Sequence, residues 1–313
     1  MKLARFLVSD EVAAALAAGR AVVALETTLV THGLPRPRGL IMAESLEAAV
    51  REQAAIPATI GILDGAVRVG LSRGELERLA ESDAAKVNLG NLAAVVSAGG
   101  AGSTTVAATA WAAAKAGIRV FATGGIGGVH RDAAESGDVS ADLPALARTR
   151  IAVVCAGAKA ILDLPRTREL LETLGVPVLG LGTAEFPAFY RRGSGLQVDA
   201  TCDSPADVAA TIAAHFRLGL PGGLVVANPI PPEHELAADV HDTALVLALA
   251  EATTAGVRGR DVTPFLLERM RVLTGDASLR ANEALLAHNA RMAAAVAVPL
   301  AAALSIDPLE PSA

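Results

Sequence analysis

The chain has 313 residues, of which 52% are hydrophobic and 19% charged, a balance that excludes a mostly disordered protein. Aromatic residues make up 3% of the sequence and the formal net charge is −6, whereas nucleic-acid-binding surfaces need stacking side chains or an excess of basic residues. We therefore expect no nucleic-acid partner, while a few local cations suffice to bind an anionic small molecule.

The sequence also predicts a soluble, cytoplasmic protein with no membrane partner. Two cysteines, Cys155 and Cys202, are too few for a disulfide framework, and acidic residues interrupt the apolar N-terminus before it reaches the length of an export signal. The uncharged segment 87–114 is long enough to span a bilayer, but its Gly, Ser and Thr residues would expose backbone polar groups to lipid. A second apolar segment, 292–304, is too short and contains Pro299.

Short runs rich in Val, Ile and Leu alternate with longer Ala-rich segments along the chain. These runs are nearly continuous in hydrophobicity, which is typical of strands that helices cover on both faces. The predicted strands are 21–25, 58–63, 118–122, 151–156, 177–181 and 223–227.

Candidate helix caps support this alternation of strands and helices. Ser9, Ser72 and Ser204 each precede a helical pattern, and residues from 233 onward form a nearly continuous helical region. The sequence therefore predicts an α/β sheet with helices on both faces, in a single domain over residues 1–313.

Glycines and polar residues gather where the predicted strands end. Glu26 follows the strand 21–25, the segment 123–130 follows 118–122, and Lys159 follows 151–156. Ligands of open α/β sheets bind at the carboxyl ends of the strands, so we expect a site there.

A glycine-rich segment, 99–106, runs directly into a helical pattern. Its glycines allow a tight turn, and the first-turn N–H groups and hydroxyls can bind an anion. Lys86, upstream, can add a positive charge. The segment lacks the Gly-Lys-Ser/Thr ending of a P-loop, so the pattern also fits ordinary helix capping with Lys86 on the surface.

The segment 138–142 offers two carboxylates and a hydroxyl, from Asp138, Asp142 and Ser140. Such oxygen ligands suit a hard divalent cation. The alternative is that Ser140 or Asp142 caps a helix that begins near Pro144.

Lys159 and Glu26 are candidates for covalent and acid-base chemistry. A lysine held against apolar walls loses its charge more easily, and its amine can then form a Schiff base with a carbonyl. Alternatively, the stem of Lys159 packs while its ammonium reaches water. Glu26 can act as a general acid or base, or can bond to nearby backbone N–H groups.

Ten segments between Glu26 and Asn289 carry a family resemblance, and such dispersed, ordered agreement is more specific than one glycine loop. The segments are 26–33 with Pro35, 57–70, 102–108, 121–130, 138–143, 155–159, 185–190, 227–231, 262–267 and 278–289. With them the chain resembles the pseudouridine-5'-phosphate glycosidases.

The resemblance implies a three-layer α/β/α sandwich with a mixed central sheet, and an enzyme that reversibly cleaves the C–C bond between uracil and ribose 5-phosphate. Lys159 matches the residue that forms a covalent adduct with the ring-opened ribose, and Glu26 matches the proton donor. The resemblance further implies substrate contacts by Lys86, Thr105, Val106, His130, Ser140, Ala141, Asp142 and Asn282. The match of Asn282 competes with Asn289 nearby.

The resemblance also implies one Mn²⁺ per subunit, held by Asp138, and a homotrimer. The segment 35–39 departs from the family pattern, which leaves its contact with the base open. A C-nucleotide synthase for another heterocycle is the nearest alternative, because it would keep Lys159 and Glu26 and change the base pocket. A Schiff-base aldolase normally needs a barrel of more strands than predicted here, and a nucleotide sensor would have no use for Lys159.

Overall fold

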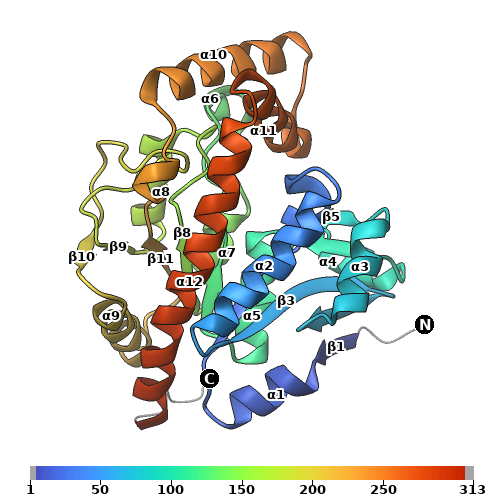
Figure 1. Cartoon of the computed structure of the whole chain (residues 1–313), viewed down its shortest axis with the longest axis vertical. Helices are drawn as coiled ribbons and strands as arrows, with labels where there is room; N and C mark the ends of the chain where they lie inside the picture. The colour runs from blue at the N-terminus through green and yellow to red at the C-terminus, as the bar shows by residue number, and fades with distance from the viewer. Residues whose placement is uncertain (1–4, 307–313) are drawn as a thin grey trace.

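The computed structural model describes residues 5–306 and places a mixed β-sheet at the centre of the molecule (Figure 1). The strands are β1 Arg5–Val8, β2 Val22–Leu25, β3 Ile56–Leu63, β4 Ala66–Val69, β5 Ala85–Val87, β6 Gly102–Thr104, β7 Val120–Ala122, β8 Ala152–Cys155, β9 Val178–Leu181, β10 Ala200–Cys202 and β11 Leu224–Ala227. Their order is β1-β4-β3-β2-β7-β8-β11-β9-β10, with β6 joining β3 and β5 joining β6.

The part of the sheet from β3 to β10 is entirely parallel between neighbours, whereas β4 and β6 run antiparallel to β3. The residues of β2, β8, β9 and β11 are all buried, because helices cover both faces.

The helices are α1 Asp10–Ala17, α2 Arg38–Glu52, α3 Arg73–Glu81, α4 Leu92–Ser97, α5 Val106–Ala116, α6 Ala133–Ser136, α7 Asp142–Leu146, α8 Leu164–Thr173, α9 Pro205–Arg217, α10 Ala238–Thr254, α11 Val262–Leu273 and α12 Ala277–Ile306. Single turns of other helix types are η1 Leu29–Gly33, η2 Pro232–His234 and η3 Gly259–Asp261. Helices α2, α9 and α12 cover one face of the sheet, and α5 with α7 covers the other (Figure 1). The predicted three-layer sandwich with a mixed sheet is therefore confirmed.

All six predicted strands are present, and so are the three predicted helix caps. Ser9 and Ser204 each accept a hydrogen bond from a first-turn backbone N–H, and Ser72 forms a reciprocal capping box with Glu75. Residues from 233 onward are largely helical, as predicted.

The prediction that the apolar segment 292–304 is too short to cross a membrane was wrong. The segment belongs to a helix of 30 residues, which is long and apolar enough to do so by length and composition. Helix α12 packs against α2 and α9 and against strands β2, β7 and β8 (Figure 1). These contacts are those of a core helix of a folded domain.

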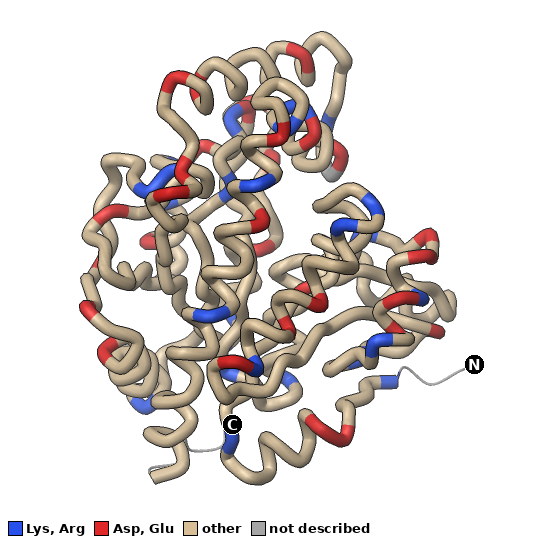
Figure 2. Tube along the Cα trace, viewed as in Figure 1, with Lys and Arg blue, Asp and Glu red and all other residues tan. Residues whose placement is uncertain are grey.

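Acidic and basic residues are interspersed along the described chain (Figure 2). The core residues form one contiguous cluster that includes residues of both halves of the sheet. Both cysteines are buried and unpaired.

Candidate active site

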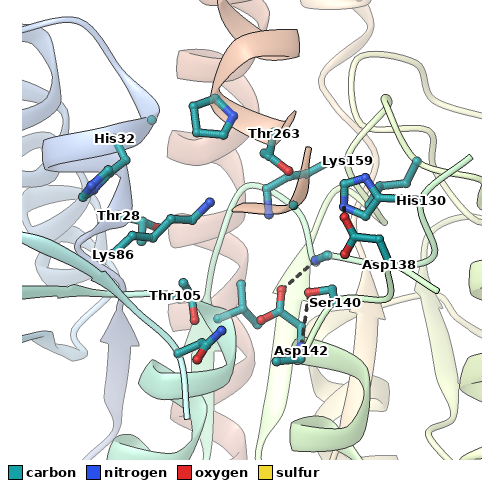
Figure 3. Close-up of a pocket in the computed structure, with 18 of the residues that line it drawn as sticks. Thr28, His32, Lys86, Thr105, His130, Asp138, Ser140, Asp142, Lys159 and Thr263 are labelled. Carbon is teal, nitrogen blue, oxygen red and sulfur yellow. Dashed lines mark hydrogen bonds and ion pairs between the residues drawn. The ribbon is translucent and has the colours of Figure 1, made fainter. Parts of the chain in front are cut away.

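A cavity of about 500 Å³ lies where β2, β7 and β8 end, as the sequence predicted (Figure 3). Ten of the eleven predicted site residues line it: Glu26, Lys86, Thr105, Val106, His130, Asp138, Ser140, Ala141, Asp142 and Lys159. Asn282 does not line this cavity. It lines a smaller one of about 300 Å³, which shares His32, Gly33, Pro264 and Leu267 with the first.

Glu26 is held by two hydroxyl groups from different elements. Thr28 donates to Oε2 of Glu26, and Thr123, which follows β7, donates to Oε1. These hydroxyls take the place of the backbone N–H groups that the sequence left as an alternative. Burial raises the pKa of Glu26. The positive charge of Lys159 and the two hydrogen bonds favour the carboxylate and oppose this rise.

Lys159 extends into the cavity and donates from Nζ to the carbonyl oxygen of Gly125 at 2.8 Å (Figure 3). The loop that carries it turns at Gly157, whose φ is +77° and where an added Cβ would lie 2.0 Å from the oxygen of Pro187. Cys155, below it in β8, is fully buried, and burial raises the pKa of its thiol to about 12. Cys155 is thus a core residue, as predicted.

Lys86 reaches into the cavity from the side opposite Lys159 (Figure 3). Its position excludes the alternative of a freely solvated surface lysine. Burial lowers the pKa of Lys86 and the positive charge of Lys159 lowers it further, while the charges of Asp142, Glu26 and Asp261 oppose the shift.

Both interpretations of the glycine-rich segment 99–106, helix capping and an anion site, find support at the start of α5. Asp142 accepts a hydrogen bond from Ala107 N at 2.9 Å, so this residue, distant in sequence, caps the helix. Thr105, the residue before the helix, makes no side-chain cap, and its buried Oγ1 has no hydrogen-bond partner among the described residues. Thr105 and Lys86 therefore offer a hydroxyl and an ammonium to a ligand in the cavity.

Asp142 also accepts a hydrogen bond from Gly127 N, through Oδ2 at 2.8 Å (Figure 3). An added Cβ at Gly127 would lie 2.1 Å from Ser140 Oγ, so this close approach requires glycine. Ser140 Oγ accepts from Asp142 N, the first residue of α7, at 3.2 Å, but the N-cap position of this helix is Ala141 and no side chain caps it, so the predicted capping of α7 by Ser140 or Asp142 is not observed. Ala141 is the residue directly before α7.

Asp138 and His130 lie side by side at the rim of the cavity (Figure 3). His130 Nε2 is 3.9 Å from Asp138 Oδ2, and His130 N donates to Asp138 O at 3.1 Å. No group of three or more His, Cys, Asp or Glu side chains that could hold a metal occurs within residues 5–306. The donors present fit a hard cation that one carboxylate holds and that keeps several waters, as Mg²⁺-like ions commonly do.

Several residues of the site were missed from the sequence. Thr28 lies two residues after Glu26 and Thr123 lies 97 residues away, in the segment 123–130 that the sequence singled out, but neither was assigned as a partner of Glu26. Thr263 and Pro264 come from α11 and lie in the segment 262–267 that contributes to the family resemblance, but no residue of that segment was assigned to the site. His32 lines both cavities, and burial and the charge of Lys86 lower its pKa.

Comparison with known proteins extends over nearly the whole chain. Residues 11–299 match the family model of indigoidine synthase A like proteins. A pseudouridine-5'-phosphate glycosidase of Rhodospirillum centenum is 59% identical over 94% of this chain and 92% of its own, and one of Jannaschia sp. is 53% identical over 92% and 96%. This chain belongs to the family of indigoidine synthase A like proteins, which includes these pseudouridine-5'-phosphate glycosidases.

Two solved structures of the family share the fold. The prealnumycin C-glycosynthase AlnA, in complex with ribulose 5-phosphate, has a TM-score of 0.89 and 37% identity over 96% of this chain and 99% of its own. An indigoidine synthase A-like protein from Thermotoga maritima has a TM-score of 0.87 and 36% identity over 96% of this chain and 98% of its own. The family resemblance, the fold and the prediction of an enzyme are thereby confirmed.

Proposed function

We propose that this protein reversibly converts pseudouridine 5'-phosphate and water to uracil and ribose 5-phosphate, through a Schiff base on Lys159. One observation carries the proposal: the amine of Lys159 and the carboxyl of Glu26 line one cavity in a member of this family. A lysine amine can add to the sugar carbon, and a buried carboxylic acid can deliver the proton that a carbon leaving group needs.

In the cleavage direction, the free amine of Lys159 attacks C1' of the ribose. The C1'–O4' bond breaks, and O4' takes the proton that the attacking nitrogen gives up as the ring opens. C1' then carries both the lysine nitrogen and uracil. A proton from Glu26 goes to C5 of uracil, the nitrogen lone pair forms the C=N bond, and the C1'–C5 bond breaks. Water hydrolyses the resulting iminium, which releases ribose 5-phosphate, restores the free amine of Lys159 and returns a proton to Glu26.

The state of Glu26 suits this role. Because burial raises its pKa, the carboxyl holds a proton at higher pH than an exposed glutamate does. Its hydrogen bonds to Thr28 and Thr123 fix both oxygens, which orients the group toward one reacting position.

The 5'-phosphate is assigned to Lys86, the hydroxyl of Thr105 and the backbone at Val106. These groups come together at the start of α5, where the helix dipole favours an anion. Binding energy from this remote group can hold the opened ribose within reach of Lys159.

Manganese is part of the proposal. Asp138 would hold the ion, with His130 beside it, and water would fill the remaining positions. When bound, the ion supplies positive charge that orients phosphate or hydroxyl oxygens of the substrate.

We also propose a homotrimer that works in the cytoplasm. Val246 and Leu247 on α10 have exposed fractions of 67% and 47%, which supports association with another subunit. The two unpaired cysteines are compatible with a reducing compartment.

A C-nucleotide synthase acting on another heterocycle is the second candidate, because AlnA is a C-glycosynthase of the same fold. The segment 35–39, whose contact with the base the resemblance leaves open, bears on this choice. Arg36 donates to Ser82 O at 3.1 Å and Arg38 lies 3.2 Å from Glu283, so both arginines are engaged within the chain.

An assay of uracil release tests the proposal and separates the candidates. Pseudouridine 5'-phosphate should yield uracil and ribose 5-phosphate, whereas uridine 5'-phosphate, which has a C–N glycosidic bond, should stay intact. Absence of uracil release, combined with coupling of ribose 5-phosphate to a different heterocycle, would select the synthase.

A further inference from the structure

Asn289 lies outside the cavity, yet it is bonded to the segment on which both candidate catalytic residues depend. It is 1% exposed, on the face of α12 that packs against β7 and β8. Its Nδ2 donates to the carbonyl of Thr123 at 2.8 Å and to that of Gly124 at 3.3 Å. Its Oδ1 accepts from Asn228 Nδ2 at 2.8 Å.

The segment 123–125 in turn touches Glu26 and Lys159. The hydroxyl of Thr123 donates to Glu26, and the carbonyl of Gly125 accepts from Lys159 Nζ. Three successive residues thus carry one contact to the acid, two contacts to Asn289 and one contact to the amine.

Few other groups fix these peptides. Thr123 N donates to Val154 O at 3.1 Å, and Gly124 O also accepts from Ala156 N at 2.9 Å. The carbonyl of Thr123 has Asn289 as its hydrogen-bond partner among the contacts described. The next N–H, that of Ile126, donates to Gly157 O at 3.0 Å. Glycine at 124 and 125 offers little conformational restriction of its own, so the donor of Asn289 adds to the few bonds that hold the segment.

We propose that Asn289 is a positioning residue, which sets the distance and orientation of Lys159 relative to Glu26 by holding the peptides of Thr123 and Gly124. This inference rests on the proposed function. It assigns Asn289 a role distinct from that of Asn282, which lines the second cavity.

The test compares Asn289→Leu and the isosteric Asn289→Asp with Val296→Ala, a fully buried site on the same helix that lies outside both cavities. We expect each Asn289 variant to lower kcat for uracil release by about 10- to 100-fold, since small displacements of reacting groups cost rates of this order. The KM should stay within about twofold, and so should the Kd for ribitol 5-phosphate, which has the phosphate but no carbonyl.

The rate at which borohydride traps ribose 5-phosphate on Lys159 should fall in parallel with kcat. The Val296→Ala control, which loses two buried methyl groups and therefore some stability, should keep kcat and trapping unchanged. Equal losses in Val296→Ala and the Asn289 variants, or unchanged kcat and trapping in either folded Asn289 variant, would overturn the inference.

The outcome separates this inference from the proposed function. If the unaltered protein releases no uracil, the proposed function is wrong, and the trapping rate on Lys159 still decides whether Asn289 positions the amine. Unaltered uracil release with no trapping on Lys159 in any protein overturns the role of Asn289.

Discussion

Asp142 caps helix α5 through a hydrogen bond from Ala107 N at 2.9 Å, although the two residues are 35 positions apart. Its second oxygen accepts from Gly127 N at 2.8 Å. One buried carboxylate therefore connects the proposed phosphate side of the cavity to the loop that leads to His130.

Replacing Asp142 should cost both stability and activity. Asp142→Ala leaves two buried N–H groups without an acceptor, and we expect a loss of about 2–4 kcal/mol in the free energy of unfolding. Asp142→Asn keeps one acceptor and should lose less. Urea unfolding of both variants, with kcat/KM measured on the folded protein, checks this; equal stability of Asp142→Ala and the parent would contradict it.

The raised pKa of Glu26 predicts a specific pH dependence of stability. The folded protein binds this proton more tightly than the unfolded chain, so stability from Glu26 is present at low pH and declines as pH rises from the ordinary glutamate value of 4.5 through the raised value. Glu26→Gln lacks this titration. Relative to the parent, the variant should gain stability across that window and lose about 100-fold or more in kcat.

Urea unfolding at a series of pH values measures this difference. A stability difference that does not vary with pH would show that Glu26 titrates alike in the folded and unfolded chains.

Lys86 should govern affinity for the phosphate. Lys86→Met removes a charged hydrogen-bond donor, which is worth about 1.5–3 kcal/mol, or about 10- to 150-fold in kcat/KM. Because the pKa of Lys86 is below the ordinary lysine value of 10.5, the parent's KM should rise as pH rises toward that value and the charge is lost.

Lys86→Arg provides the control, since arginine keeps its charge throughout this range. It should remove the alkaline rise in KM. The assignment of Lys86 fails if unphosphorylated pseudouridine reacts as well as its 5'-phosphate, or if the alkaline rise persists in Lys86→Arg.

Asp138 should dominate the affinity for Mn²⁺. We expect Asp138→Asn to weaken Mn²⁺ binding by about 10- to 100-fold or more, because even residues outside the direct ligands have effects of that size. Asp132→Asn, an exposed neighbour that does not line the cavity, serves as the control. Titration calorimetry measures the binding itself; identical affinities of the two variants would remove Asp138 from the metal site.

The sequence predicted strands β2, β3, β7, β8, β9 and β11 because strands such as β8 are continuous apolar runs. It did not predict β1, β4, β5, β6 or β10. Of these, β5 and β6 have three residues each and contain Lys86 and Gly102. A short strand with a polar side chain or a glycine has no pattern that separates it from a loop.

The residues of the site likewise divide into those that the sequence could predict and those that it could not. Glu26 could be predicted because it directly follows a recognisable strand, and Lys159 because it lies in the loop after another, four residues beyond Cys155; the family resemblance then assigned their roles. The partners of Asp142 could not, because Ala107 and Gly127 contribute only backbone N–H groups, which every residue type other than proline has. The placement of Asn282 beside a second cavity depends on how α12 packs, and no local pattern encodes that packing.

The central claim is that Lys159 forms the covalent bond to the sugar. The most direct measurement is mass spectrometry of peptides after the protein is incubated with ribose 5-phosphate and borohydride, which reduces the C=N bond to a stable amine. We predict one adduct, on the peptide that contains Lys159, and neither adduct nor uracil release in Lys159→Ala. An adduct on another lysine, or normal turnover by Lys159→Ala, would contradict the account.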